Sequence, residues 1–228
     1  AIDLVPTFLG AHTVPDEFAD RREDYVALLC EKLIPAVAEE NLARFCDVFV
    51  EDGAYSVADA RRILGAAQDH GLGLKIHADQ LSAGGGALLA AEMGAVSAEH
   101  LEYVTPEAIT ALAASGTVAV SLPLASLYLA ERYLPARALL EAGVPVAVAT
   151  DFNPGSAPSF HLPLAMTLAC LNQSMTPQEA LMGATTVAAR AVSLEDQVGS
   201  LMPGLRADLA IIDAPSLNHW LYHFIPNA

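Results

Sequence analysis

The sequence alternates between short apolar runs and longer segments in which apolar residues recur with helical spacing. The apolar runs are rich in β-branched residues, which favours strands, and glycines follow several of the helical segments. Continuous apolar strands that alternate with helices predict a parallel sheet covered by helices. The apolar runs are residues 4–12, 46–52, 72–79, 95–101, 117–123 and 144–151, and the main helical segments are 18–41, 56–69, 85–93, 105–115, 135–142, 160–172 and 175–191.

Two helix starts are marked with particular clarity. Thr105 precedes Pro106, and Thr176 precedes Pro177, so each pair offers an N-cap hydroxyl followed by a proline at the first helical position. We therefore expect helices to begin at residues 106 and 177.

Polar side chains stand at or near the carboxyl ends of these strands. In a (β/α)8 barrel those ends converge on one face, where the active site is built. An open doubly wound sheet would instead gather its ligand groups at one crevice, and the sequence contains no glycine-rich nucleotide fingerprint. The pattern favours the barrel. The side chains concerned are His12, Glu51, Asp52, His77, His100 and Asp151.

The number of strands departs from that of a closed barrel, because six are visible in the sequence and a barrel has eight. A smaller open α/β sheet is one explanation. The one we favour is an incomplete TIM-like barrel in residues 1–192, holding strands three to eight. Residues 193–228 contain turn residues around short β-prone pieces, which predicts part of a small C-terminal β-domain.

Composition excludes several classes of partner. A formal net charge of -16 with only 11 basic residues argues against nucleic acid and against anionic membranes. No apolar run reaches the ~18 residues that a membrane span needs. The cysteines are far apart and lie in apolar surroundings, which favours buried, reduced thiols and a cytoplasmic location.

Three side chains carry the expected chemistry: His77 in "KIHADQ", His100 in "SAEHLE" and Asp151 in "ATDFNPG". Imidazole and carboxylate groups at converging strand ends are typical of a catalytic zinc or iron site with one position open for water. A single histidine would be explained more simply as a satisfied core or surface residue. Three such groups at equivalent places in a repeated βα pattern favour a metal-dependent hydrolytic site.

The order and spacing of "KIHADQLSAGGGALLAAEMGAVSAEHLEY", "VATDFNPGSAP" and "GSLMPGLRADLAIID" resemble the amidohydrolase superfamily. Together with "PTFLGAHTVPDEF" near the start, they are similar to the imidazolonepropionases within it. The resemblance covers essentially the whole chain. It implies one divalent metal, zinc or iron, and hydrolysis of 4-imidazolone-5-propanoate to N-formimino-L-glutamate in histidine degradation.

The resemblance also implies roles for the three side chains at the strand ends. His77 matches the metal-binding histidine of the fifth barrel strand. Asp151 matches the aspartate of the eighth strand, which binds the metal and shuttles a proton. His100 matches a histidine that polarises the substrate or helps the attacking water.

Substrate contacts follow from the same resemblance. His12 matches a histidine that contacts the imidazolone ring. The loop formed by Asn153, Gly155 and Ser156 matches the segment that receives the propionate carboxylate. An amide, backbone N–H groups and a hydroxyl together suit an anion.

The sequence departs from the family pattern at two places. The His-x-His pair that supplies two further metal ligands is absent, so a chain with only His77 and Asp151 should bind metal weakly and be inactive alone. Gln80 stands where some relatives carry glutamate. Glutamine cannot act as a base, so Gln80 could only orient substrate or water, and Asp151 would carry the proton.

Two other interpretations remain open. A purine or pyrimidine deaminase would share the positions of His77, His100 and Asp151, but it would usually carry an acid at position 80 and lack the "FNPGS" loop. The second is a non-catalytic piece that persists only by association with other chains.

The apolar tail, with Trp220, Tyr222 and Phe224, indicates packing against another part of the protein or a homodimer partner. Glu51 is either a supporting residue or merely solvated.

Overall fold

The computed structural model describes residues 2–223, so Phe224 lies outside the described residues. The chain forms two compact units, Ala1–Thr117 and Val118–Ala228. The first contains β1 (Thr7–Ala11), η1 (Asp16–Phe18), α1 (Arg22–Leu28), η2 (Leu29–Leu33), α2 (Ile34–Glu39), β2 (Phe45–Val50), α3 (Val57–Asp69), β3 (Gly73–Ala78), α4 (Gly86–Met93), β4 (Ser97–His100) and α5 (Pro106–Ser115).

The second unit is mainly helical around two strands. It contains β5 (Val118–Ser121), α6 (Pro123–Leu129), α7 (Ala136–Glu141), β6 (Val146–Val148), α8 (Leu162–Gln173), α9 (Pro177–Ala184), α10 (Thr186–Ala191) and α11 (Leu217–Tyr222). Among the described residues, none of the helices has both the length and the apolar character that crossing a bilayer would require.

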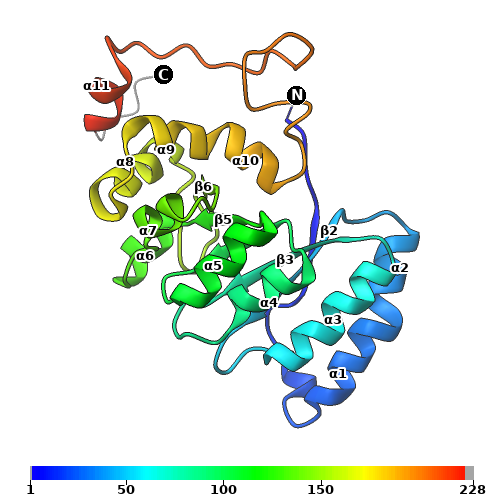
Figure 1. The fold of residues 1–228 in the computed structure, drawn as a ribbon. Coiled ribbons are helices and arrows are strands. Elements are labelled where there is room, and N and C mark those ends of the chain that lie inside the picture. The colour runs from blue at the N-terminus through cyan, green and yellow to red at the C-terminus, as the bar shows by residue number, and fades with distance from the viewer. Residues whose placement is uncertain (1, 224–228) are drawn as a thin grey trace. The chain divides into compact units, whose positions relative to one another are not determined.

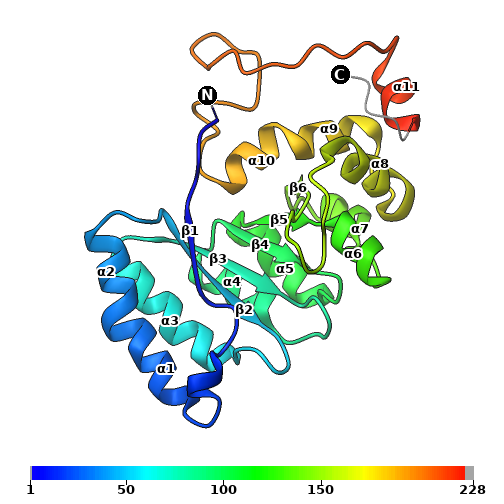
Figure 2. The same cartoon turned by 180° about the vertical axis from the view of Figure 1, so that it is seen from behind.

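In the first unit, β1 to β4 pair in chain order and in parallel, as the alternating pattern predicts. Helices α3, α4 and α5 lie on one side of these strands, in front of them in Figure 1 and behind them in Figure 2. The register of β1 shifts between Phe8 and Ala11, immediately before His12. Such an irregularity at a strand end re-aims the side chain that follows it.

The strand register sets rows of inward polar side chains. Asp47 on β2 is opposite Lys75 on β3, and Lys75 is opposite Ser97 on β4. Two residues further along each strand, His77 is opposite Glu99. Because side chains on one face recur every second residue, Lys75 and His77 share a face of β3. A buried row thus lies beneath the strand ends that carry the candidate site.

The helix starts behave as the sequence predicts. The hydroxyl of Thr105 accepts a bond from the N–H of Ala108, and Pro106 begins α5. Thr176 and Glu179 form a reciprocal capping box at the start of α9. These contacts satisfy N–H groups that a helix leaves unpaired at its first turn.

The first long helical segment differs from the regular helix expected between residues 18 and 41. Its helical part runs from Arg22 to Glu39 and contains a π-turn, η2, at Leu29–Leu33. Pro35, two residues after the end of this turn, supplies the reason. Proline cannot donate to the residue four positions earlier, and its ring clashes with that carbonyl, so the wider turn relieves the clash.

In the second unit, β5 and β6 pair in parallel. The segment expected at 175–191 is divided into α9 and α10 at Thr185, where φ is -127° and ψ is -91°. Gly183 lets α9 approach β6 closely, because a Cβ there would lie 3.0 Å from the carbonyl oxygen of Val146. Residues 193–216 form turns and extended chain, with no strand among the described residues. The β-domain at 193–228 stays a prediction.

Candidate active site

Two histidines and an aspartate lie together in the first unit. Nδ1 of His77 is 3.0 Å from Oδ1 of Asp47, and Nε2 of His12 is 3.4 Å from the same oxygen. The two imidazole rings are in edge contact, with centroids 4.5 Å apart. One potential ligand atom from each residue lies within 4.8 Å of the others, so this group could hold a metal ion. It brings together two of the residues expected at the site.

Asp47 is the carboxylate at the centre of this group and is only 2% exposed. Burial alone would raise its pKa, but the rings of His77 and His12 outweigh burial and hold the pKa of the carboxyl below its usual range. Asp47 is therefore an ionised acceptor for nearby N–H groups. Asp47 is not among the residues predicted from the sequence, although a lone acid within the apolar run "FCDVFV" is an unusual residue for a buried strand.

His100 lies next to this group. Its ring centroid is 5.3 Å from that of His77, and the residue is buried. Nδ1 of His100 faces Oε1 of Glu102 at 3.6 Å. The first unit thus brings His12, His77 and His100 into one cluster, and buried carboxylates face all three rings.

The backbone is strained at the strand ends that carry these residues. Of the eight non-glycine residues with positive φ in the described part of the chain, four lie at strand ends and four follow helices. Those at strand ends are Asp79 after β3, His100 and Leu101 at the end of β4, and Asp151 after β6. Such conformations cost of order 1–3 kcal/mol each and persist only where the surroundings enforce them. The conformations at these strand ends therefore depend on the structure around them.

Gln80 lies in a loop held by two carboxylates. Glu51, at the end of the β2 region, accepts bonds from the N–H groups of Leu81 at 2.8 Å and Ser82 at 3.2 Å, and from the Ser82 hydroxyl. Burial would raise the pKa of Glu51, but these bonds outweigh it and lower the pKa below its ordinary value. Glu51 is therefore a supporting residue, which decides between the two interpretations left open by the sequence.

Asp79 holds the other end of the same loop. It is 1% exposed and accepts bonds from the N–H groups of Gly85 at 3.0 Å and Gly86 at 3.2 Å, at the start of α4. Its pKa is raised because burial outweighs these bonds. The backbone of Gln80 is thus fixed between two anchored segments.

Replacing Glu51 with alanine is expected to lower the free energy of unfolding by about 2–4 kcal/mol, because the N–H groups of Asp52, Leu81 and Ser82 lose their charged acceptor. Urea denaturation of the intact protein measures this. Alanine at Asp52, an exposed neighbour, is the matched control and should change stability little. Equal stability of both variants would contradict the anchoring role of Glu51.

Asp151 and the predicted substrate loop lie in the second unit, after β6. Asp151 is half-buried with φ of 54°. Asn153 organises the loop that follows. Its Nδ2 donates to the carbonyl of Asp151 at 2.7 Å, and its Oδ1 accepts from the N–H groups of Gly155 and Ser156 at 2.9 and 2.8 Å. The loop is therefore folded around the Asn153 side chain.

The hydrogen bonds within this loop involve the same groups that are predicted to bind the propionate carboxylate of the substrate. The N–H groups of Gly155 and Ser156 already bond to Asn153, and the Ser156 hydroxyl lies 2.9 Å from Asn153 Nδ2. A bound propionate would compete with Asn153 Oδ1 for the two N–H groups. The role of this loop in substrate binding stays a prediction.

Comparison with known proteins assigns both units of the chain to one family. Residues 1–225 match the model of the amidohydrolase family. The chain is 51% identical over 224 residues to an imidazolonepropionase of Symbiobacterium thermophilum, covering 97% of this chain and 53% of that protein. It is 47% identical over 223 residues to an imidazolonepropionase of Fusobacterium nucleatum, covering 98% and 54%. The chain therefore spans about half the length of these curated relatives.

Solved structures share the fold at lower identity. A zinc-bound adenosine deaminase from Xanthomonas campestris superposes with a TM-score of 0.75 at 21% identity, covering 96% of this chain and 56% of that one. A Xaa-Pro dipeptidase superposes with a TM-score of 0.64 at 20% identity, covering 82% and 54%. The predicted α/β fold of amidohydrolase type is confirmed, with six strands in the described residues. This chain belongs to the amidohydrolase family.

Proposed function

We propose that the intact protein hydrolyses a ring C–N bond of 4-imidazolone-5-propanoate and yields N-formimino-L-glutamate. The observation that carries this proposal is the identity to imidazolonepropionases of 51% and 47% over nearly the whole chain. The matched regions span both the histidine cluster of the first unit and the Asp151 loop of the second. The adenosine deaminase likeness, at 21% identity, supports the fold alone.

His77 and Asp151 are the proposed metal ligands in this chain, with zinc or iron as the metal. The chemistry of His77 fits, because its Nδ1 bonds to Asp47 and its Nε2 can then offer a lone pair to a cation. A divalent metal at such a site lowers the pKa of water toward ~7 and polarises a carbonyl group.

Asp151 carries the proton in the proposed reaction. Its carboxylate takes a proton from the attacking water as the new C–O bond forms at the ring carbonyl carbon. It then returns the proton to the leaving ring nitrogen as the C–N bond breaks. His100 stabilises the negative charge that develops on the carbonyl oxygen.

The remaining contacts orient the substrate. Gln80 cannot accept a proton, but its amide can hydrogen-bond water or substrate. His12 contacts the imidazolone ring. Asn153, Gly155 and Ser156 receive the propionate carboxylate after giving up part of the bonding within their loop.

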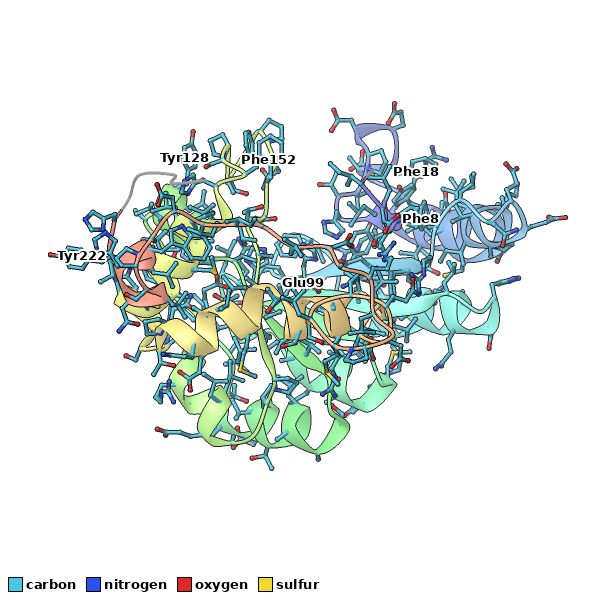
Figure 3. All side chains as sticks on the ribbon, turned by 90° about the horizontal axis from the view of Figure 1, so that it is seen from above. Phe8, Phe18, Glu99, Tyr128, Phe152 and Tyr222 are labelled. Atoms are coloured by element: carbon cyan, nitrogen blue, oxygen red, sulfur yellow. The ribbon has the colours of Figure 1, made fainter. Side chains whose placement is uncertain are left out.

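We also propose that the intact protein works as a cytoplasmic homodimer. The described cysteines are all free thiols, which suits a reducing compartment. Tyr222, the last residue of α11, is 80% exposed, and so is available for packing against a partner (Figure 3).

Loss of the imidazolone chromophore tests the reaction directly. We expect the intact protein to consume 4-imidazolone-5-propanoate, and a strong chelator to abolish this turnover because the metal supplies the Lewis acid. Adding back zinc or iron should restore it, and the better of the two identifies the metal. Adenosine is the control substrate. Turnover that persists in metal-free protein would contradict the metal role, and absent turnover with metal bound would contradict the substrate.

A further inference from the structure

Two histidines near the end of α11 are not among the candidate active-site residues and have no role in the proposed reaction. His219 lies in the last turn of this helix, and His223 directly follows Tyr222, its final residue. Residues four positions apart lie on the same side of a helix, and the two rings have centroids 4.4 Å apart. Both residues are exposed. The second unit thus presents a pair of neighbouring imidazole rings to solvent.

A hydrogen bond between the two residues orients the ring of His223. Its Nδ1 lies 2.8 Å from the backbone carbonyl oxygen of His219. A carbonyl oxygen can only accept, so Nδ1 is the donor, and Nε2 remains to bind a ligand. Histidines that bind metal ions commonly donate their second ring nitrogen to a backbone carbonyl in this way. The ring of His223 is therefore held as a metal ligand would be.

The helix that carries these rings is held at both ends. At its start, the hydroxyl of Ser216 accepts a bond from the backbone N–H of His219 at 3.1 Å. Toward its end, the hydroxyl of Thr167 on α8 lies 2.8 Å from the carbonyl oxygen of Leu221, whose side chain is buried. Helix α11 lies beside α8 in both ribbon views (Figures 1 and 2). The two rings therefore project from a fixed segment of backbone, which lowers the entropy lost when one ligand binds both.

The donor atoms decide which kind of ligand suits this pair. Imidazole nitrogens favour late first-row metal ions such as zinc, nickel and copper, whereas Mg²⁺ and Ca²⁺ require oxygen ligands. Two histidines four residues apart on one helix face are an established arrangement for zinc, and the formal net charge of -16 favours the approach of a cation. With two ligands from the chain, water would complete the coordination, so the affinity should be lower than at a structural zinc with four protein ligands.

We propose that His219 and His223 form a surface metal site that binds one zinc ion or a related late transition-metal ion. An ion bound by both rings connects the last turn of α11 to the residue that follows this helix. The two histidines are not part of the candidate active site, so the proposal does not rest on the proposed hydrolysis.

The test is calorimetric titration of Zn²⁺ into the intact protein, compared between the wild type and single variants. In His219→Gln and in His223→Gln, the affinity for one zinc equivalent should fall at least about 10-fold, because removing even a residue that supports a metal ligand costs that much. Both histidines are exposed, so glutamine should leave the fold intact. His70→Gln is the matched control, since His70 is an exposed histidine of the first unit, and it should bind zinc as the wild type does.

Long-range ¹H–¹⁵N correlation of ¹⁵N-histidine gives a second measurement, in which zinc should shift the Nε2 resonance of His223. Equal zinc binding by the wild type and both helix variants would overturn the proposal and leave the two rings in aromatic contact only. An equal loss of affinity in His70→Gln would overturn it as well, because it would indicate non-specific binding to exposed imidazoles. Neither measurement depends on turnover, so failure of the proposed hydrolysis would leave this result unaffected.

Discussion

Replacing Asp151 with asparagine in the intact protein is expected to lower kcat for imidazolone ring opening by at least about 10³-fold. General acid–base groups contribute about 10²–10⁴-fold, and this residue is also a proposed metal ligand, so both contributions are lost together. Asparagine is the sharper substitution because it tolerates positive φ, and the φ of Asp151 is 54°. Alanine at the same position should abolish turnover as well, with added backbone strain.

The chromophore assay measures kcat, and metal analysis of the purified variant separates the two contributions. Asp213→Ala is the control, because Asp213 is an exposed aspartate of the same unit and should retain wild-type turnover. Turnover near the wild-type rate in Asp151→Asn would reject Asp151 as the proton carrier.

Replacing Lys75 with alanine is expected to lower the free energy of unfolding by about 3–5 kcal/mol. Lys75 and Glu99 are both 8% exposed, and Nζ of Lys75 lies 3.1 Å from Oε1 of Glu99. Ser97, fully buried between them, accepts from Lys75 and donates to Glu99. Removing the lysine leaves an uncompensated carboxylate in the interior, which is the costly way to break a buried pair.

Urea denaturation measures the loss of stability, and two further variants serve as controls. Arg61→Ala removes one partner of an exposed ion pair with Glu92 and should cost less than about 1 kcal/mol. The double variant Lys75→Met with Glu99→Leu should recover most of the stability, because no unpaired charge remains. A Lys75→Ala variant as stable as Arg61→Ala would contradict the buried pair.

Local signals predicted much of the fold. The alternation of strands and helices is confirmed, and Thr105 and Thr176 cap the helices that their sequence context marks. These features depend on residues only a few positions apart, so one chain segment contains all the information. The π-turn before Pro35 follows the same logic but was missed, because the proline lies inside a long stretch with good helical spacing.

The candidate site was predicted only in part, because its contacts join distant segments. His77 and His100 stand out as histidines at strand ends, and the structure places their rings side by side. Asp47 could not be assigned to His77 from the sequence, since 30 residues separate them and the contact depends on strand register. The hydrogen bonds from the N–H groups of Gly155 and Ser156 to Asn153 could not be predicted either. Residues of these types can hydrogen-bond to a bound anion or to one another, and the sequence does not distinguish the two cases.

The positive φ angles at Asp79, His100, Leu101 and Asp151 restrict which residues can replace them. A substitution at these positions must satisfy the chemistry of the side chain and a left-handed backbone at once. β-branched residues fail the second requirement, so valine, isoleucine and threonine are poor replacements even where their size would fit. In a mutational library of this protein, tolerance at these four positions should therefore follow backbone preference as much as polarity, with asparagine and glycine retaining the fold more often than larger apolar residues.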